Sequence, residues 1–269
     1  MKVVFSRVQI NVLYLPINLW AVSEEKKQRI REMREICIPE EISYHGINRL
    51  YRDMGFLFTR MFLRTKITPN QITWIWGALA FIFCLFFLFD DPWLHIAGAV
   101  GWMMTHALDH TDGHVARYKQ MFSKAGAFLD GVIHLATWAL LFICIGFGRY
   151  FVSGDISDVV FGVMAGLFMS LILALNYLYQ TVAGERPADA GIGKTSERKF
   201  RLVINLSPLS TMNVYPVILA VTIFDMIFSV QLLWMTSLLS VALLCYGIGF
   251  ALMFLWTAGR FCRNVSAIR

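Results

Sequence analysis

The stretch DHTDGHVARYKQMFSKAGAFLDGVIH, residues 109–134, is a polar passage in a chain that is otherwise strongly apolar. Nothing between residues 105 and 117 breaks a helix except a single glycine. At about 100° per residue, Asp109 and Asp112 then lie on one helix face, together with Gly113 and Ala116. Arg117 lies at the edge of that face. The first half of the stretch therefore predicts a helix that carries two carboxylates beside small residues.

The second half of the stretch predicts another helix with a polar face. Gly126, Asp130 and His134 are spaced four residues apart, so they share one side of a helix. The linker YKQMFSK, residues 118–124, is short enough to make the two helices antiparallel neighbours. We therefore expect three carboxylates and one imidazole to converge between them.

The rest of the chain indicates that lipid is its main solvent. Hydrophobic residues make up 57% of the sequence and charged residues 16%, whereas soluble domains carry about a quarter charged residues. A helix that crosses a bilayer needs about 20 mostly apolar residues. Six stretches qualify or come close, at 72–89, 93–108, 127–147, 159–179, 214–230 and 232–255. The sequence predicts an all-α integral membrane fold with six transmembrane helices.

The basic residues indicate the topology. Of the 24 Lys and Arg residues, 12 precede residue 67, three lie between the second and third spans, five lie between the fourth and fifth, and three follow the sixth. Only Arg149 falls in a connection on the other side. Because positive residues favour cytoplasmic loops, we expect both termini and the aspartate-rich stretch at the cytoplasmic side. Such a distribution is a topology signal and gives no reason to expect a nucleic-acid partner.

The N-terminal part has a different composition. We expect residues 1–47 to form a cytoplasmic extension that contains a charged helix at 23–36. The apolar segment 8–20, near the beginning of this extension, lies at the membrane interface or packs on the domain. Residues 48–67 mix apolar side chains with arginines, which is typical of a juxtamembrane amphipathic helix; a cytosolic helix packed on the domain is the alternative. The six-helix transmembrane domain then spans 68–260, and a cytoplasmic tail spans 261–269.

Three carboxylates at membrane depth repel one another unless a cation joins them, and such groups mark a functional site by default. Hard divalent ions with oxygen ligands, Mg²⁺ or Mn²⁺, resolve the repulsion and keep positions open for phosphates. Arg117 adds a fork suited to phosphate oxygens, beside the small residues Gly113, Ala116 and Gly126. The residues indicate a metal-assisted phosphate-transfer site that opens to the cytoplasm. The alternative is plain helix packing, with the aspartates paired to nearby Arg and Lys residues.

The stretch resembles the signature of the CDP-alcohol phosphotransferase family, D-x2-D-G-x2-A-R-x8-G-x3-D-x3-D. The segment TKITPNQIT, residues 65–73, also resembles the one that leads into the first helix of the family. The resemblance covers residues 48 to 260 and leaves the N-terminal extension unexplained. Seven signature positions match at every spacing: Asp109, Asp112, Gly113, Ala116, Arg117, Gly126 and Asp130.

The resemblance implies a six-helix membrane enzyme, commonly a homodimer, that works in phospholipid or polar-lipid biosynthesis. It would transfer a phosphoalcohol group from a CDP-linked donor (CDP-diacylglycerol or a CDP-alcohol) to an alcohol hydroxyl and release CMP. Two divalent ions would be held by Asp109, Asp112 and Asp130. The CDP-binding residues would be Gly113, Ala116, Arg117 and Gly126, with Asn70 and Thr73 as weaker candidates.

His134 is the departure from the family pattern, which has an aspartate there that acts as general base and helps to hold a metal. A neutral imidazole can accept a hydroxyl proton, but it supplies no negative charge, and its nitrogen suits Mn²⁺ or Zn²⁺ better than Mg²⁺. His134 is thus a candidate both for the base and for a metal ligand, and the second metal site is in doubt. Three outcomes stay open: an active enzyme with His134 as base, a transferase with an unusual donor or acceptor, and a non-catalytic homologue that binds CDP.

Several other residues carry weaker signals. His106, His110 and His114 drift away from the aspartate face by about 40° per step, which favours packing or hydrogen bonding over a second metal site. The five cysteines are scattered, without a CxxC pair, so we expect free thiols. A transporter, the rival class, would more often show internal repeats and broken helices at mid-membrane. Three basic residues of the loop after the fourth span could meet an acceptor phosphate or anionic lipids, or serve only as topology signals: Lys194, Arg198 and Arg201.

Overall fold

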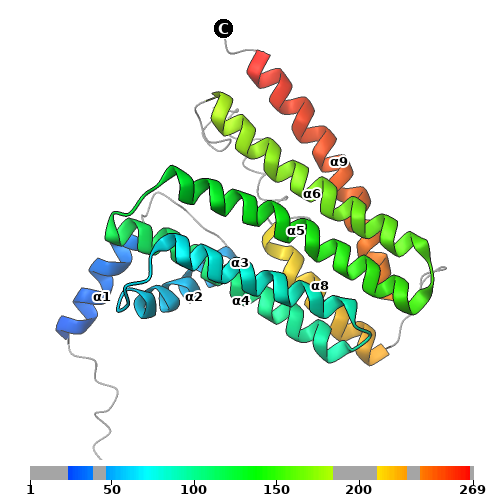
Figure 1. The fold of residues 1–269 in the computed structure, drawn as a ribbon, viewed down its shortest axis with the longest axis horizontal. Helices are drawn as coiled ribbons and strands as arrows, with labels where there is room; N and C mark the ends of the chain where they lie inside the picture. The colour runs from blue at the N-terminus through cyan, green and yellow to red at the C-terminus, as the bar shows by residue number, and fades with distance from the viewer. Residues whose placement is uncertain (1–23, 39–46, 184–210, 229–236, 267–269) are drawn as a thin grey trace, which may run out of the picture.

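The computed structural model describes residues 24–38, 47–183, 211–228 and 237–266. These residues form helices and short connections, without a β-strand in the described ranges. Figure 1 shows long helices stacked side by side, with the two N-terminal helices at one end of the stack. The α-helices are α1 (Glu24–Cys37), α2 (Ile47–Phe62), α3 (Pro69–Leu85), α4 (Pro92–Lys119), α5 (Lys124–Ser153), α6 (Ile156–Ala183), α8 (Thr211–Phe228) and α9 (Leu238–Ser266), and a 3₁₀ turn, η2 (Phe86–Leu88), follows α3.

Helix α4 runs unbroken through the first half of the aspartate-rich stretch, as predicted. It begins after Asp91, whose side chain accepts a hydrogen bond from the backbone N–H of Trp93, the usual role of an N-cap residue. It ends where Gln120 adopts a left-handed conformation. Ser123 then caps α5 by accepting from the backbone N–H of Gly126 at 2.9 Å. These caps fix the short turn between the two halves of the motif.

Side chains of α4 and α5 meet directly, at Asp109 and His134 and at Trp102 and Trp138, and α3 adds a third wall that was not predicted. Helix α3 packs against both α4 and α5, while the backbones of α4 and α5 stay apart along their lengths. The linker brings the two helix ends together, and α3 lies against both helices. The motif side chains therefore meet in a space formed by three helices, α3, α4 and α5, whereas the sequence predicted a site formed by two.

Close helix packing elsewhere depends on small residues. Helix α6 packs against both α5 and α9. A Cβ atom added at Gly146 of α5 would lie 2.7 Å from the carbonyl oxygen of Asp158, and one at Gly162 of α6 would lie 2.6 Å from that of Phe142. Both distances are shorter than real side chains tolerate, so glycine permits this α5–α6 contact, as small residues do between membrane helices.

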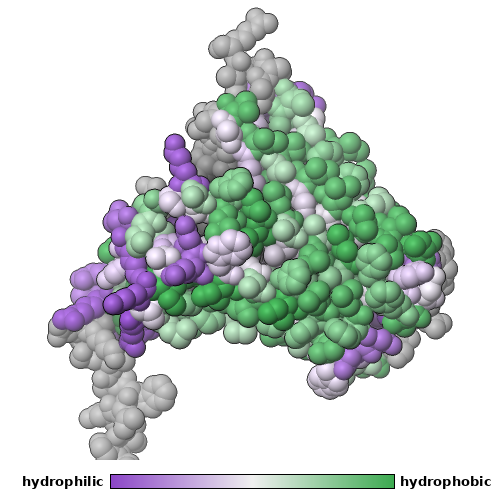
Figure 2. Space-filling model, in the orientation of Figure 1, coloured by the Kyte–Doolittle hydropathy of each residue, from purple (hydrophilic) through white to green (hydrophobic). Residues whose placement is uncertain are grey.

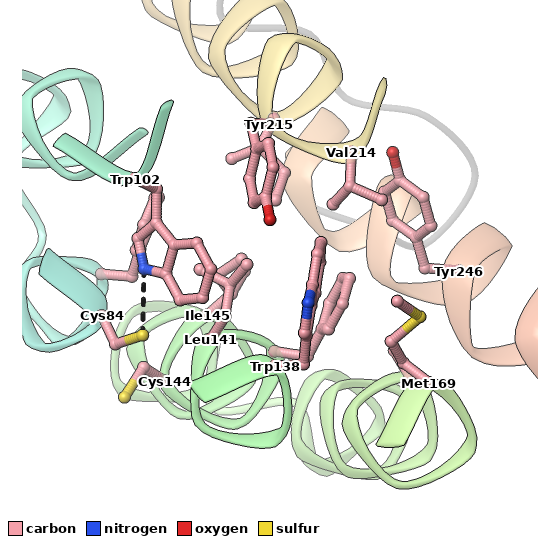
Figure 3. Close-up of a cluster of buried hydrophobic side chains, with 14 of the residues drawn as sticks. Cys84, Trp102, Trp138, Leu141, Cys144, Ile145, Met169, Val214, Tyr215 and Tyr246 are labelled. Carbon is pink, nitrogen blue, oxygen red and sulfur yellow. Dashed lines mark hydrogen bonds between the residues drawn. The ribbon is translucent and has the colours of Figure 1, made fainter. Parts of the chain in front are cut away.

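An aromatic cluster fills the centre of the bundle (Figure 3). Tyr215 of α8 projects between Trp102 of α4 and Trp138 of α5, with ring centroids 5.4 and 5.1 Å away. The indole N–H of Trp102 donates to the Cys84 sulfur at 3.1 Å, which gives its polar atom a partner inside the apolar core. The same three aromatic residues line a small space together with Asp109 and His134 of the motif.

The surface agrees with an integral membrane protein. Figure 2 shows a broad hydrophobic surface over the long helices and hydrophilic residues gathered near the N-terminal helices. By length and composition, four helical segments could cross a membrane, Pro69–Leu88, Lys124–Ser153, Ile156–Tyr179 and Leu238–Asn264, and Asn213–Phe228 is a shorter apolar helix. The predicted all-α membrane fold class is confirmed; the number of six spans remains a prediction.

The last two predicted spans, 214–230 and 232–255, lie largely in α8 and α9. Helix α8 ends at Phe228 and α9 begins at Leu238, and the predicted break near residue 231 lies outside the described residues. The start of α9 is fixed by side chains, because Ser237 accepts from the N–H of Leu239 at 3.0 Å and Asp225 accepts from that of Leu238 at 3.2 Å. Helix α9 then continues into the residues predicted as a tail.

Candidate functional site

An open cavity of about 700 Å³ lies where α4 ends and α5 begins. Its walls come from the start of α3, the last two turns of α4, the α4–α5 turn and the first turns of α5. All six residues predicted to contact a CDP moiety line it: Asn70, Thr73, Gly113, Ala116, Arg117 and Gly126. Asp112 and Asp130 line the same cavity. One space therefore unites two halves of the motif and a segment about 40 residues earlier in the chain.

Asp109, Asp130 and His134 form a compact cluster beside this cavity, with one ligand atom from each lying within 4.8 Å of the others. The His134 Nε2 atom is 3.5 Å from Asp109 Oδ2, and its Nδ1 atom is 3.4 Å from Asp130 Oδ1. Asp109 and His134 line a small, narrow space of about 10 Å³ beside the aromatic cluster, whereas Asp130 also faces the open cavity. The imidazole thus lies between the two carboxylates, on the narrow side of the site.

Asp112 is oriented by α3 and does not belong to this cluster. Its Oδ2 atom accepts hydrogen bonds from Thr73 Oγ1 at 2.7 Å and from Trp76 Nε1 at 3.2 Å. These two donors are three residues apart, so they lie on one face of α3. They hold the carboxylate at the cavity wall. Trp76 was missed by the sequence reasoning; its spacing from Thr73 was the available signal.

The hydrogen bonding of His134 identifies which ring nitrogen carries the lone pair when the ring is neutral. Nδ1 lies 3.0 Å from the backbone carbonyl of Asp130, and a carbonyl can only accept, so Nδ1 carries the hydrogen. In the neutral ring the lone pair therefore belongs to Nε2, the atom directed at Asp109. A carbonyl that fixes the tautomer from the other nitrogen is the usual arrangement for histidines in metal and catalytic sites.

The carboxylates fit a divalent ion. Asp130 Oδ1 is buried without a hydrogen-bond donor, and a buried acceptor in that state is costly unless a cation or water satisfies it. Asp109 and Asp130 each bring an oxygen atom within 4.8 Å of the other, so one cation held by oxygen ligands can lie close to both. The chemistry of the donor set and its spacing both suit a bound metal.

The neighbouring histidines have structural contacts. His114 Nδ1 lies 3.0 Å from Thr59 Oγ1 of α2. His106 packs edge-on against Tyr51, with ring centroids 4.9 Å apart, and approaches Asp109 at 3.7 Å. Among the described residues the metal-type cluster contains none of the three. These contacts agree with the packing role predicted for His106 and His114.

Small residues in the motif keep the cavity open. A Cβ atom added at Gly126 would lie 2.5 Å from Asn70 Oδ1, so any side chain there would displace the asparagine. At Gly113 an added Cβ atom would lie 3.5 Å from both Nη atoms of Arg117, which places the guanidinium over that glycine. The two glycines thus let polar groups of α3 and α4 approach the backbone at the cavity wall.

The basic residues near the motif bond to main-chain carbonyls. Arg117 Nε donates to the Cys37 carbonyl at 2.7 Å, and Lys119 Nζ donates to those of Thr65 and Ile67 at 3.2 and 2.9 Å. The link between Arg117 and α1 had no signal in the sequence. Lys194, Arg198 and Arg201 lie outside the described residues.

Comparison with known proteins agrees with the geometry. The family model for CDP-alcohol phosphatidyltransferase matches residues 66–246, well over half of the chain. This range contains α3, α4 and α5, the helices that enclose the site, and excludes α1 and α2. No curated protein matches the chain significantly. The chain belongs to the CDP-alcohol phosphatidyltransferase family.

Proposed function

We propose that the protein transfers a phosphoalcohol group from a CDP-linked donor to an alcohol hydroxyl, with release of CMP, in phospholipid or polar-lipid biosynthesis. The family consists of transferases of phosphate groups; it implies a CDP-alcohol donor and an alcohol acceptor, and it generally depends on divalent metals. The observation that carries the proposal for this chain is the cluster of Asp109, Asp130 and His134 beside a cavity lined by the other motif residues.

The open cavity is where we place the donor. Its volume of about 700 Å³ falls within the usual range for ligand pockets, about 300–1,000 Å³. The small residues Gly113, Ala116 and Gly126 give it a smooth wall against which a flat base or ribose can lie. Arg117 supplies a planar donor fork that matches phosphate oxygens, and Asn70 and Thr73 supply polar groups from α3. These assignments are supported by the shared lining of a single cavity.

Asp109, Asp112 and Asp130 are the proposed metal ligands. A divalent ion, Mg²⁺ or Mn²⁺, would neutralise the negative charge of the donor diphosphate when bound. Thr73 and Trp76 hold the Asp112 carboxylate at the cavity wall. Asp130 lines the open cavity, and its Oδ1 atom has no hydrogen-bond donor, so this carboxylate would be available to hold the ion.

We assign the general base to Nε2 of His134. The acceptor hydroxyl would lose its proton to Nε2 while its oxygen bonds to the phosphorus that carries the donor's alcohol, and the bond from that phosphorus to CMP would break. Asp109 and Asp130 lie 3.5 and 3.4 Å from the ring, so the imidazolium that forms would lie between two carboxylates. Because Nδ1 is committed to a carbonyl, the neutral ring has one lone pair, and Nε2 cannot be base and metal ligand at the same time.

The test is CMP release by the full-length protein in detergent, with Mn²⁺ or Mg²⁺ and a panel of donors and alcohols. The donors are CDP-diacylglycerol and soluble CDP-alcohols, and the lipid product is identified by mass spectrometry. We expect CMP release that requires a donor, an acceptor and a metal together. The non-catalytic alternative predicts that CDP with metal raises the melting temperature while no donor releases CMP.

The assembly and topology form part of the same proposal. We propose a homodimer with both termini in the cytoplasm and the cavity open to the cytoplasmic side. The charge distribution supports this orientation, since 23 of the 24 Lys and Arg residues lie in alternate connections or terminal segments. Light scattering of the purified protein tests the dimer, and cysteine accessibility in oriented vesicles tests the orientation.

A further inference from the structure

Helix α1 lies outside the range matched by the family, yet its last residue contacts a residue of the motif. The carbonyl of Cys37 accepts a hydrogen bond from Arg117 Nε at 2.7 Å, and α1 packs against α4. Carbonyls in the last turn of a helix lack intrahelical partners and form the negative end of its dipole. A guanidinium is therefore a favourable partner for this helix end. Figure 1 shows α1 at the end of the stack where α4 terminates.

The Arg117 guanidinium connects α1 with the donor cavity. Its Nε atom faces the Cys37 carbonyl, while its two Nη atoms lie over Gly113, and Arg117 lines the open cavity. A guanidinium is planar and rigid, so fixing the bond at Nε also fixes the direction of the terminal nitrogens. The end of α1 thus determines how the fork is presented to the cavity.

Helix α1 is itself held in place by contacts with α2. Arg34, one turn before the end of α1, forms an ion pair with Asp53 and lies over the Phe56 ring, 5.6 Å from its centroid. Helix α2 is in turn fixed to α4, since Thr111 Oγ1 donates to the Gly55 carbonyl at 3.1 Å. A continuous path of contacts leads from α2 through Arg34 and the end of α1 to Arg117.

We propose that α1 is a positioning element of the donor site: its docked C-terminal end orients the Arg117 fork toward the donor's phosphates. Arg117 contacts the donor, and α1 acts through it. The inference rests on the proposed donor site, and it adds that an element outside the matched range controls donor affinity. Undocking α1 should weaken binding of a cytidine diphosphate without removing the carboxylates that hold the metal.

Cys37 provides a direct readout of docking. Its side chain is fully buried, and burial raises the pKa of its thiol to about 11, although Arg117 opposes the shift. A docked α1 therefore protects Cys37 from a maleimide, and an undocked α1 exposes it. Cys84 and Cys144 are buried in the core, and the exposed Cys245 and Cys262 can be replaced by serine.

The experiment uses charge reversal across the α1–α2 contact in this serine background. Arg34→Glu and Asp53→Arg are made singly and together, and Arg31→Glu, an exposed residue of the same helix, is the matched control. Each full-length protein is tested for CDP affinity by calorimetry with Mn²⁺ present and for the rate of Cys37 labelling. We expect each single reversal to weaken CDP binding about tenfold, the size of one lost charge-assisted contact, and to speed labelling. The double reversal should restore both values, and the control should change neither.

A second variant and a ligand effect complete the test. Deleting residues 1–38 removes α1 altogether and should weaken CDP binding at least as much as the single reversals. Saturating CDP should slow Cys37 labelling in the parent protein, because coupling between two sites is reciprocal. Unchanged CDP affinity in the deletion variant, or faster labelling with CDP, would overturn the inference. A parent protein that does not bind CDP with Mn²⁺ would instead refute the proposed function.

Discussion

Replacing His134 by alanine tests the central chemical assignment of the site. The side chain lies 3.5 Å from Asp109 and 3.4 Å from Asp130, and its removal leaves both carboxylates and Asp112 in place. A positioned general base contributes about 10²–10⁴ in rate, equivalent to roughly 2.7–5.4 kcal/mol of barrier. We expect His134→Ala to lower CMP release by that factor while Mn²⁺ affinity changes less than about tenfold, because the proposed metal ligands are carboxylates.

Two further substitutions separate the roles of the ring. His134→Gln keeps a polar side chain of similar length but has no basic nitrogen, so it should be as slow as the alanine variant. His134→Asp places a third carboxylate near Asp109 and Asp130, so it should bind Mn²⁺ or Mg²⁺ more tightly and recover part of the rate. The assays are CMP release at saturating substrates and calorimetric metal titration of the same preparations.

The refuting result is specific. A His134→Ala protein with full activity would eliminate the base assignment. A loss of Mn²⁺ affinity of 100-fold or more, parallel to the loss of rate, would show that Nε2 is a metal ligand, because its single lone pair then belongs to the metal.

Four other predictions follow from the structure. Gly126→Ala should abolish measurable CDP binding, because its Cβ would lie 2.5 Å from Asn70 Oδ1, whereas Gly259→Ala, with no atom within 4 Å of its Cβ, should bind CDP normally. Gly148→Ala should lower the melting temperature, since its Cβ would lie 1.8 Å from the Phe87 carbonyl oxygen and overpacking costs about 1–3 kcal/mol or more; an unchanged melting curve would contradict this. Treatment with EDTA should remove the thermal protection by CDP, and added Mn²⁺ should restore it; protection that survives EDTA would argue against metal-bridged binding. Alkylation of Cys37 at pH 8 should be slow in the folded protein and fast after denaturation, because burial raises the thiol pKa from 9.0 to about 11 and keeps it protonated; equal rates would show that α1 is not docked.

The fold class and the faces of the motif could be predicted because they depend on local spacing. Helix periodicity predicted one helix through Asp109 and Asp112 and another through Gly126, Asp130 and His134, and both are present as α4 and α5. The apolar composition predicted a membrane fold. Each of these properties is set by residues that are neighbours in the chain or lie one helical turn apart.

The parts that could not be predicted depend on contacts between distant residues. Helix α3 packs against both α4 and α5, and no spacing within the motif encodes which helix takes that position. The bond between Arg117 and the Cys37 carbonyl joins residues 80 positions apart and uses a main-chain acceptor, which has no sequence signature. The start of α9 depends on Asp225 and Ser237, two polar residues that lie inside the spans predicted from hydropathy.

The motif residues are divided between the open cavity and the narrow space beside the aromatic cluster. This division explains why a histidine, His134, can stand at the fourth position of the motif. Asp112 and Asp130 face the open cavity, whereas Asp109 and His134 line a narrow space of about 10 Å³ whose walls include Trp76 and the aromatic cluster. A fourth carboxylate in that narrow space would add a negative charge beside Asp109 with little room for water, and an anion buried in this way requires a cation. An imidazole donates from Nδ1 to the Asp130 carbonyl at 3.0 Å, and when protonated it also directs an N–H from Nε2 toward Asp109 at 3.5 Å. A histidine at this position therefore costs less electrostatically than a carboxylate would, and the same substitution reduces the negative charge that could hold a second ion.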